Sequence, residues 1–373
     1  IDFSFFGGMG LLRRTVTGEV SMALLQHTWR RMRGSMRVIE LAAAGLTTLL
    51  LAAGAVVIMI PLAFMISTSL KDPAQIRSDA NALLPRKLVM QAYNGDTYPV
   101  YEVTTPAGTK TMLMLKKAPG GNAIFVDPQQ PDVQLTLPLA AQHAQYVLDI
   151  HWENYPDAMQ AMPFVQYLIN TLLVTFVGMA GMLFSSSLVA YGFSRFRARW
   201  LDLLFLVLLS TIMLPSQVRL IPIYVFFQQL GWVNTLLPLI VPQFFANAYD
   251  VFLLRQFIMT IPLELDDAAR IDGANPLEIL LYIILPQARP ALVSVAIFHF
   301  LYAWNDFYEP LIFLHTKDQW TLAVGLQTFD SLYTINTHLI MAVSVLMIVP
   351  PIVLFFLAQR IFTQGVVFSG VKG

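Results

Sequence analysis

The sequence predicts an all-α integral membrane protein that carries one small β-rich insertion. Three observations support this fold class. Of the 373 residues, 56% are hydrophobic and 12% are charged, and the mean hydropathy is +0.62. Several apolar stretches reach the length of about 20 residues that a helix needs to cross a bilayer core. One long polar stretch between the first two of them has the composition of β-strands instead.

Six stretches are predicted to cross the membrane as helices. They cover residues 39–66, 164–190, 201–225, 237–254, 291–314 and 339–361. Proline breaks or kinks helices. The prolines in or beside the third and fourth stretches are Pro215, Pro222, Pro238 and Pro242. We therefore expect irregular helices in this part of the chain.

These stretches divide the chain into five parts with a predicted orientation. The parts are a cytoplasmic N-terminal tail (1–37), the first transmembrane helix (38–70), an extracytoplasmic insertion (71–162), a transmembrane core (163–363) with a cytoplasmic loop at 260–287, and a cytoplasmic C-terminal tail (364–373). The orientation follows from the enrichment of Arg and Lys in cytoplasmic flanks. The flanks assigned to the cytoplasm contain Arg13, Arg14, Arg30, Arg31, Arg33, Arg37, Arg195, Arg197, Arg199, Arg255, Arg270, Arg289, Arg360 and Lys372. The opposite short connections contain little beyond Arg219 and Lys317.

The insertion has the pattern of a small β subdomain. Its segment TYPVYEVTTPAGTKTMLMLKKAPGGNAIFVDPQQPDVQLTL contains β-rich runs that are separated by Pro-Ala-Gly and Pro-Gly-Gly turns. A flexible loop is the alternative. We expect the β subdomain, and we expect it to contact an extracytoplasmic partner.

Composition and motifs exclude several classes of function. The formal net charge is zero, which gives no indication of nucleic-acid binding. The absence of Cys excludes disulfides, a thiolate nucleophile and Cys-ligated metals. The sequence contains neither a Gly-x-x-x-x-Gly-Lys-Ser/Thr loop for ATP nor a His-Glu-x-x-His helix for zinc. We therefore expect no catalytic residue, cofactor or metal ion in this chain.

The polar segment LDDAARIDGANP interrupts two apolar runs and is predicted to form two short helices. Pro262 suits a first helical position, and Glu264 suits the first turn, where a carboxylate faces the positive end of the helix dipole. Gly273 is suited to end this helix in a left-handed conformation. Asn275 can cap the next helix, which Pro276 would begin.

One face of the first short helix is predicted to be small enough for close approach by another surface. Leu265, Ala268, Ala269 and Asp272 share this face by helical spacing. A compact knob of this kind can insert into a cleft of a partner protein, or it can be a solvated connecting loop. The residues alone leave both readings open.

The motif in this segment resembles that of a known family. DAARIDG (267–273) is followed after nine residues by IILP (283–286), and this pattern resembles the EAA loop of binding-protein-dependent ABC importer permeases. In that family the loop is a coupling helix that docks on a cytoplasmic ATPase subunit. Asp267 occupies the position of the family's Glu, so that the carboxylate is kept but is one methylene shorter. The resemblance implies that Asp267 meets a basic residue of the ATPase, that Ala268 and Ala269 pack in its cleft, and that Gly273 makes the turn.

The resemblance assigns ATPase coupling to a set of residues. The set is Glu264, Asp267, Ala268, Ala269, Asp272, Gly273, Asn275, Pro276 and Pro286. It also implies the six-helix fold of type I ABC importers. In that fold the C-terminal tail reaches toward the ATPase, as residues 371–373 would here.

Further stretches are similar to the carbohydrate branch, of the maltose-transporter type. They are PLAFMISTSLK (61–71), ENYPDA (153–158), YLINTLLVT (167–175), AYGFSRFR (190–197), WNDFYEPLIFL (304–314) and SGVKG (369–373). The resemblance implies import of a sugar or oligosaccharide, with a glucoside as one candidate, by ATP-driven alternating access. It implies as partners a second homologous permease, an ATPase homodimer that binds ATP and Mg, an extracytoplasmic solute-binding protein and membrane lipid. The stretch between residues 71 and 153 is several-fold longer than the family's usual link.

Polar groups inside predicted spans are candidates for a substrate pathway, since they are costly in lipid. Gln243, Asn247 and Asp250 have spacings of four and three, which place them on one helical face. They could line a hydrophilic passage or hydrogen-bond to neighbouring helices. Asn170 and Thr171 are expected to be packing or hydrogen-bonding residues.

The fifth predicted span offers a second group of pathway candidates. Trp304, Asn305 and Asp306 combine an aromatic face with groups that bind hydroxyls, a combination suited to a sugar ring. An interfacial aromatic belt with polar groups at a helix end is the alternative. We assign Tyr308 and Glu309 to that belt.

Three other functions remain as alternatives on the sequence. An ABC permease for a non-sugar solute, such as a polyamine or a glycerol phosphate derivative, would share the coupling loop. An ion-driven secondary transporter or a membrane scaffold for a sensor complex would not need it.

Overall fold

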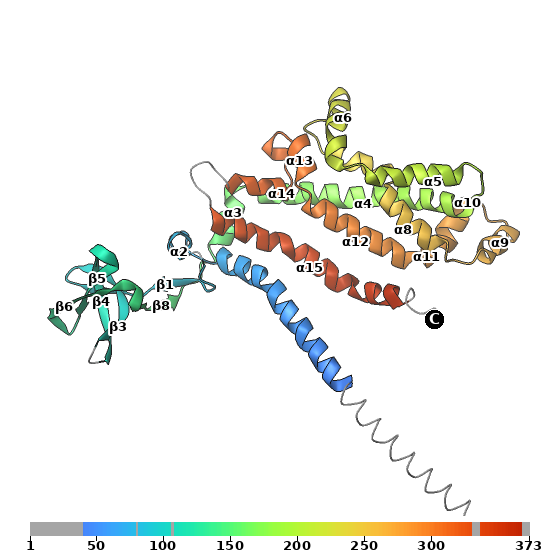
Figure 1. Cartoon of the computed structure of the whole chain (residues 1–373). Coiled ribbons are helices and arrows are strands. Elements are labelled where there is room, and N and C mark those ends of the chain that lie inside the picture. Colours follow the sequence, from blue (N-terminus) through green and yellow to red (C-terminus); the bar gives the residue numbers. More distant parts are fainter. Residues whose placement is uncertain (1–39, 80, 106–107, 330–335, 368–373) are drawn as a thin grey trace, which may run out of the picture. The chain divides into compact units, whose positions relative to one another are not determined.

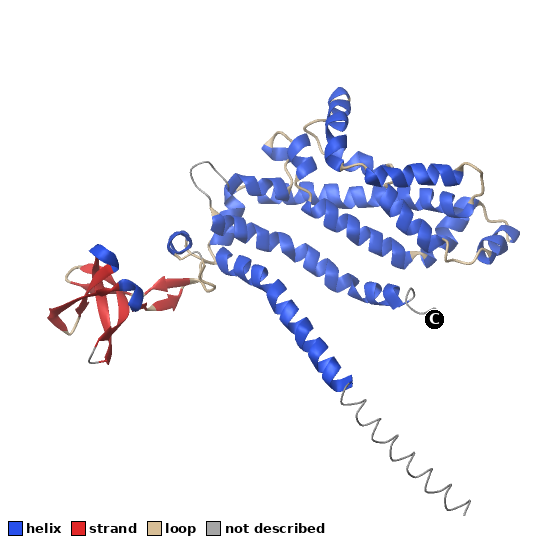
Figure 2. Ribbon diagram, viewed as in Figure 1, coloured by secondary structure: helices blue, strands red, loops and turns tan. Residues whose placement is uncertain are grey.

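The computed structural model describes residues 40–79, 81–105, 108–329 and 336–367. The chain divides into two compact units between Phe64 and Met65. The predicted N-terminal tail and residues 371–373 lie outside the described residues. The strands all lie between residues 86 and 148, and the rest of the described chain is helical or loop (Figure 2).

The helices follow the predicted spans, but several are broken. The first helix is Glu40–Ser69. The later elements are α2 (Pro73–Ser78), α3 (Asn154–Ala161), α4 (Phe164–Arg195), α5 (Leu201–Ser210), η3 (Thr211–Met213), α6 (Ser216–Gln229), α7 (Leu237–Ile240), η4 (Val241–Phe244), α8 (Ala248–Ile258), α9 (Glu264–Ile271), α10 (Pro276–Glu278), the π-helical η5 (Ile279–Ile284), α11 (Leu285–Gln287), α12 (Arg289–Asn305), α13 (Tyr308–Phe313), η6 (Lys317–Gln319), α14 (Leu322–Gly325), η7 (Leu326–Phe329) and α15 (Thr337–Val367).

Within the described residues, four helices are long and apolar enough to cross a membrane, or up to six if each bent pair counts as one span. The four are Glu40–Ser69, Phe164–Arg195, Leu237–Ile258 and Thr337–Gln359. One bent pair, Leu201–Met213 with Gln217–Gln229, turns by 101°. The third predicted span, 201–225, is therefore bent, as the prolines in this part of the chain led us to expect. Pro215 lies at this bend, where a helix cannot continue without a break.

The fifth predicted span also differs from a single helix. The pair Pro276–Gln287 and Arg289–Asn305 is bent by 80°. At its other end α12 stops at Asn305, and the extended backbone of Asp306 leads to the separate helix α13. Asp306 accepts hydrogen bonds from the N–H groups of Tyr308 and Glu309 at 3.1 and 3.4 Å, and so it caps α13. The WNDFYEP stretch is thus a helix break.

Helix α4 is the centre of the helical part and contacts α8, α12, α14 and η4 (Figure 1). Small residues permit this approach. A Cβ atom added to Gly181 would lie 2.4 Å from the Phe244 ring, so η4 packs where α4 has no side chain. Near the opposite end of α4, Asn170 donates hydrogen bonds to the carbonyls of Asp318 and Trp320 at 2.9 and 3.0 Å. The packing role expected for Asn170 is confirmed.

Residues Arg86–Leu148, which we call the β lobe, confirm the predicted β-rich insertion. Its strands are β1 (Arg86–Leu88), β2 (Met90–Tyr93), β3 (Asp96–Thr105), β4 (Gly108–Ala118), β5 (Asn122–Asp127), β6 (Gln130–Pro138), β7 (His143–Ala144) and β8 (Tyr146–Leu148). The main sheet has the antiparallel order β2-β3-β4-β5-β6, with β7 on β3. Asn94 and Gly95, both at positive φ, make the β2–β3 turn, as Asn-Gly does in two-residue hairpins. The flanking segments form helices α2 and α3, so only part of the insertion is β structure.

The two chain segments that flank the β lobe are hydrogen-bonded to each other. Asn154, 5% exposed, donates hydrogen bonds to the carbonyls of Ser69 and Lys71 at 2.9 and 3.0 Å. The hydroxyls of Ser69 and Tyr155 are also hydrogen-bonded at 2.9 Å. Strands β1 and β8 pair above this junction, with Leu88 opposite Tyr146. Both ends of the β lobe therefore meet at one place.

Candidate functional site

The segment at 260–287 adopts the two-helix form predicted from its residues. Gly273 follows α9 with φ +88°, the left-handed conformation expected of it. Asn275 accepts hydrogen bonds from the N–H groups of Leu277 and Glu278, both at 3.0 Å, and the Glu278 carboxylate accepts from the Asn275 N–H at 2.7 Å. This capping box fixes the start of the next helix. Pro262 is not the first helical residue, since α9 begins at Glu264.

Helix α9 has an inward and an outward face that divide the predicted coupling residues. Asp266 and Ala269 are buried within the chain. Ala269 packs in the apolar cluster formed with α4 and α8. It therefore cannot share an outer docking face with Ala268, as the helical spacing had suggested. The exposed members of the set are Glu264, Asp267, Ala268, Asp272, Gly273, Asn275, Pro276 and Pro286.

Two neighbouring aspartates of α9 have opposite environments. Asp267 is exposed, with 68% of its side chain accessible, and pairs with Arg270 of the same helix at 3.2 Å. Asp266 is buried, with 2% of its side chain accessible, and pairs with Arg195 of α4 at 3.1 Å. Sequence reasoning missed Asp266, because nothing in the motif shows which aspartate turns inward.

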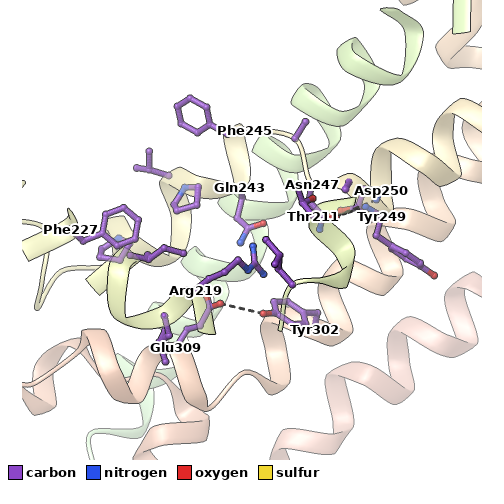
Figure 3. A pocket seen from close by; sticks show the side chains of 18 of the residues that line it. Thr211, Arg219, Phe227, Gln243, Phe245, Asn247, Tyr249, Asp250, Tyr302 and Glu309 are labelled. Atoms are coloured by element: carbon purple, nitrogen blue, oxygen red, sulfur yellow. Dashed lines mark hydrogen bonds between the residues drawn. The ribbon is translucent and has the colours of Figure 1, made fainter. Parts of the chain in front are cut away.

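A cavity of about 1080 Å³ lies among η3, α6, η4, α8 and α12 (Figure 3). It exists because the helix that begins at Leu237 breaks between Phe244 and Ala248. Ser185 of α4 holds this break: its hydroxyl accepts a hydrogen bond from the Ala246 N–H at 3.1 Å and lies 3.2 Å from the Gln243 carbonyl. Side-chain hydroxyls commonly satisfy backbone groups freed by such breaks in membrane helices.

Gln243, Asn247 and Asp250 all line this cavity, although they do not share a continuous helical face. Gln243 lies in η4, before the break. Asn247 caps α8, and its side-chain oxygen accepts from the Tyr249 N–H at 2.8 Å. Asp250 is 4% exposed in the first turn of α8. The break, rather than helical periodicity, brings the three together.

The second group of pathway candidates is separated by the structure. Trp304 is 1% exposed in the packed core, where its indole N–H donates to the Met347 carbonyl at 2.9 Å. Asn305 is exposed and donates to the Leu301 carbonyl. Neither is among the cavity-lining residues. Asp306 lines a small gap of about 10 Å³ together with Gln243.

Arg219, His299, Tyr302 and Glu309 also line the cavity, and they were not predicted to do so. Gln243, Arg219, Tyr302 and Glu309 point toward one another in Figure 3, and the Tyr302 hydroxyl lies 3.5 Å from a Glu309 carboxylate oxygen. Glu309 lines the cavity from the first turn of α13. His299 completes the group: it is 6% exposed, and its Nε2 has no hydrogen-bond partner among the described residues.

A sequence signal for this group existed. The polar residues His299, Tyr302, Asp306 and Glu309 recur at spacings of three, four and three, the pattern of one helical face, although α12 ends at Asn305 and only His299 and Tyr302 lie on it. Gly178 of α4 makes room opposite this face. A Cβ atom there would lie 3.3 Å from Cγ of Gln243 and 3.4 Å from Nε2 of His299.

Comparison with known proteins decides the family. Residues 182–367, which contain α8, the cavity break and the α9 segment, match the family of binding-protein-dependent transport system inner membrane components. The chain is also 36% identical over 204 residues to the arabinooligosaccharides transport system permease protein AraQ of Halalkalibacterium halodurans, covering 55% of this chain and 73% of that protein. The chain belongs to this transport family. The resemblance to carbohydrate ABC importer permeases is thereby confirmed.

Other relatives extend the comparison. The lactose transport system permease protein LacG of Rhizobium radiobacter is 32% identical over 200 residues, or 54% of this chain and 73% of LacG. The sn-glycerol-3-phosphate transport system permease protein UgpE of Escherichia coli O6:K15:H31 (strain 536 / UPEC) is 32% identical over 220 residues, or 58% of this chain and 78% of UgpE. A chain of a bacterial ABC transporter that imports the acidic polysaccharide alginate has the same fold, with a TM-score of 0.61 at 19% identity over 84% of this chain and 94% of that chain.

Proposed function

We propose that this family member carries a neutral sugar or oligosaccharide across the membrane through the cavity at Gln243, by ATP-driven alternating access. The single observation that carries the substrate class is the composition of the cavity wall. The wall combines aromatic rings with polar groups that bind hydroxyls, and Arg219 is the only Lys or Arg among its described residues. Each bent helix pair is proposed to be one membrane span, which gives six.

Stacking surfaces and hydrogen-bonding groups line the cavity together. Phe227, Phe245, Tyr249 and Phe313 lie in its wall, and the rings of Phe227 and Trp232 stack at 5.5 Å. Sugars present apolar C–H faces to such rings and hydroxyl groups to polar side chains. The volume of about 1080 Å³ reaches the upper end of the size range of small-molecule sites, about 300–1,000 Å³. A disaccharide or larger fits this size better than a single small ion.

The charge balance disfavours an anionic solute. Asp250 and Glu309 line the cavity against Arg219, and Asp306 lies in the adjoining gap. A permanently negative phosphate or uronate would meet more carboxylates than guanidinium groups in a region of low dielectric constant, where like charges repel strongly. The relationship to UgpE keeps glycerol phosphate as the second candidate, and the carboxylates alone would also suit a polyamine. The aromatic wall and the relationship to AraQ and LacG favour a sugar.

Identification of the solute needs the intact transporter with its native partners. Mass spectrometry of the solute that co-purifies with the binding protein should detect a neutral saccharide. Proteoliposomes that contain the whole assembly should then take up radiolabelled arabinooligosaccharide or lactose in preference to sn-glycerol 3-phosphate or spermidine. Preferred uptake of the phosphate ester or of spermidine would overturn the assignment of substrate class.

We further propose that the exposed face of α9 is the coupling surface for a separate ATPase. This face is on the cytoplasmic side, with both chain termini, in the orientation given by the Arg and Lys flanks. Asp267 and Ala268 are exposed at its centre, so they are available to a partner. The partner ATPase would bind ATP and Mg, and this chain would bind neither. A second permease and an external binding protein would complete the assembly.

Reversal of charge at Asp267 tests the coupling proposal. Asp267→Arg should abolish uptake and the stimulation of ATP hydrolysis by the liganded binding protein, because two basic groups would then face each other. Arg270→Gln is the matched control, since it removes the internal partner of Asp267 and leaves the carboxylate in place. Normal uptake by Asp267→Arg would remove α9 from the coupling mechanism.

The β lobe is proposed to contact the solute-binding protein outside the membrane. Because Leu88 and Tyr146 pair across β1 and β8, residues 89–145 can be replaced by a short Gly-Ser linker without separating the ends of the core. We expect the deleted transporter to assemble with its ATPase and to bind the binding protein more weakly. Unchanged binding would exclude the lobe from docking.

A further inference from the structure

A buried ion pair joins the coupling helix to the longest helix of the core. Nε of Arg195 lies 3.1 Å from Oδ2 of Asp266, and only 2% of each side chain is exposed. Nη2 of the same Arg195 donates a hydrogen bond to the carbonyl of Ile261 at 2.9 Å. Arg195 thus holds both α9 itself and the chain just before it. Its own position is the last turn of α4.

Arg195 is the main partner of the Asp266 carboxylate among the described residues. Among the described residues, neither carboxylate oxygen of Asp266 accepts a hydrogen bond, and Arg195 is its one ion-pair partner. The Arg195 Nε contact meets the distance of an ion pair but not the geometry of a hydrogen bond. A buried carboxylate that loses its only cation is strongly destabilised. Separation of α9 from the end of α4 would therefore leave a buried charge without a partner.

Apolar packing surrounds this pair and includes the same two helices. Tyr191 and Ala190 of α4 and Ala269 of α9 belong to one buried cluster, together with Ile258 at the end of α8. Arg255 of α8 donates a hydrogen bond from its Nε to the Phe193 carbonyl of α4 at 3.2 Å. The last turn of α4 is therefore joined to α8 as well as to α9.

Helix α4 continues from this junction to the cavity. At about 1.5 Å of rise per residue, Ser185 lies about 15 Å along α4 from Arg195. Ser185 holds the backbone break at Gln243 and Ala246. Helix α8, tied to α4 by Arg255, begins at the other side of that break with Asn247 and Asp250. A displacement of the α4 end would reach both sides of the cavity break.

We propose that the Arg195–Asp266 ion pair makes α9 and α4 move as one body, so that movement of the ATPase reaches the cavity through α4. This inference rests on the proposed docking of α9 on an ATPase. Arg195 and Asp266 are positioning residues: they touch neither solute nor ATPase. The two neighbouring aspartates have different roles: Asp267 faces the partner ATPase, and Asp266 faces the core of this chain.

The first test is the number of solute molecules transported for each ATP hydrolysed. In proteoliposomes with the complete assembly, Asp266→Asn should lower this ratio about tenfold, within the usual range of coupling between sites, while the ATPase still co-purifies. Asp202→Asn, an exposed carboxylate at the start of α5, is the matched control and should keep the ratio. Asp266→Asn leaves Arg195 buried without its ion-pair partner and should lower the protein yield. The double variant Arg195→Gln with Asp266→Asn removes both buried charges. Its protein yield should return to that of the native chain, whereas its transport ratio should stay low. A restored ratio in the double variant would overturn the proposal.

A distance measurement tests the single-body movement without reference to activity. The sequence of this chain contains no Cys, so Ser194→Cys and Leu263→Cys can be spin-labelled without background from it, in an assembly whose partner subunits have their Cys residues replaced. The mean distance between the labels should be the same in the ATP-free and the ATP-bound transporter. The distribution of distances should become broader when Asp266→Asn is added. A change of this distance with ATP in the otherwise native chain would show that α9 moves separately from α4 and would end the proposal.

The outcomes separate this inference from the coupling proposal itself. If Asp267→Arg abolishes uptake while Asp266→Asn keeps the native transport ratio, the coupling surface stands and the ion-pair inference is wrong. If neither substitution changes transport, the coupling surface is wrong as well.

Discussion

Buried charged groups are paired at the Arg195 end of α4, but a buried polar group that faces α4 beside the cavity is unpaired. At the Arg195 end, the charged side chains of Arg195 and Asp266 are buried and paired within the chain. At the cavity, the Nε2 atom of His299 is buried without a hydrogen-bond partner among the described residues. Paired buried charges resist separation, whereas a buried polar atom without a partner carries the cost of its lost hydration. In the proposed mechanism, the first region transmits movement and the second receives the solute.

The largest expected effect breaks the first region. Arg195→Ala should destabilise the protein by about 3–5 kcal/mol, because Asp266 is left buried without its cation. The measurement is thermal unfolding of the purified assembly in detergent. Arg197→Ala, at an exposed position two residues later, is the control and should change stability by no more than about 0.5 kcal/mol. Equal stability of the two variants would mean that the ion pair is not closed in the membrane.

Overpacking at the η4 contact should have the next largest effect. Gly181→Leu places a side chain where an added Cβ atom would already lie 2.4 Å from the Phe244 ring. We expect a loss of about 1–3 kcal/mol and slower uptake, because η4 carries Gln243. Gly192→Leu in the same helix meets nothing within 4 Å of its Cβ and should not destabilise the protein. A similar loss of stability in both variants would show that replacement of any α4 glycine destabilises the helix and that the η4 contact is not the cause.

Two adjacent serines of α4 test the support of the cavity break. Ser185→Ala should cost about 1–3 kcal/mol, because it leaves buried backbone groups at the break unsatisfied. The neighbouring Ser186 is fully buried, and its hydroxyl has no hydrogen-bond partner among the described residues. Ser186→Ala should therefore be neutral or slightly stabilising. Thermal unfolding of both variants decides the matter, and a reversed order would show that Ser185 does not hold the break.

The smallest expected effect on stability is at His299. His299→Phe replaces an unpartnered buried ring by an apolar ring of similar shape, so the free energy of unfolding should stay within about 0.5 kcal/mol or rise. Uptake should require about two- to tenfold more liganded binding protein for half-saturation, since one hydrogen bond to the solute is lost. An unchanged half-saturation point would remove His299 from the route of the solute.

Local chemistry made parts of this molecule predictable. The turn at Gly273 and the cap at Asn275 depend on residues that are adjacent in sequence, and both were predicted correctly. The inward turn of Asp266 was not predictable in this way, because its partner Arg195 belongs to another helix. A helical motif states which residues share a face, but only tertiary contacts decide which face is buried.

The cavity also shows where prediction from helical spacing fails. Helical spacing was applied to Gln243 and Asp250 as though the helix were continuous, and the break at Asn247 gives them a common site for a different reason. Glu309 was assigned to an interfacial belt with polar groups at a helix end, and the break at Asp306 places it in the first turn of α13, where it also lines the cavity. Trp304 was chosen for its chemistry, but its burial against Met347 makes it a core residue. Where a chain bends inside a membrane, periodicity beyond the bend loses its meaning.

The junction of Asn154 with Ser69 and Lys71 has a consequence for how such proteins diversify. The scaffold is already closed below the β lobe by these hydrogen bonds, and the lobe leaves and returns through the paired strands β1 and β8. A stretch of this kind can be gained, lost or exchanged in one genetic event while every membrane helix keeps its neighbours. The sequence of the lobe can therefore change without any change in the packing of the membrane helices.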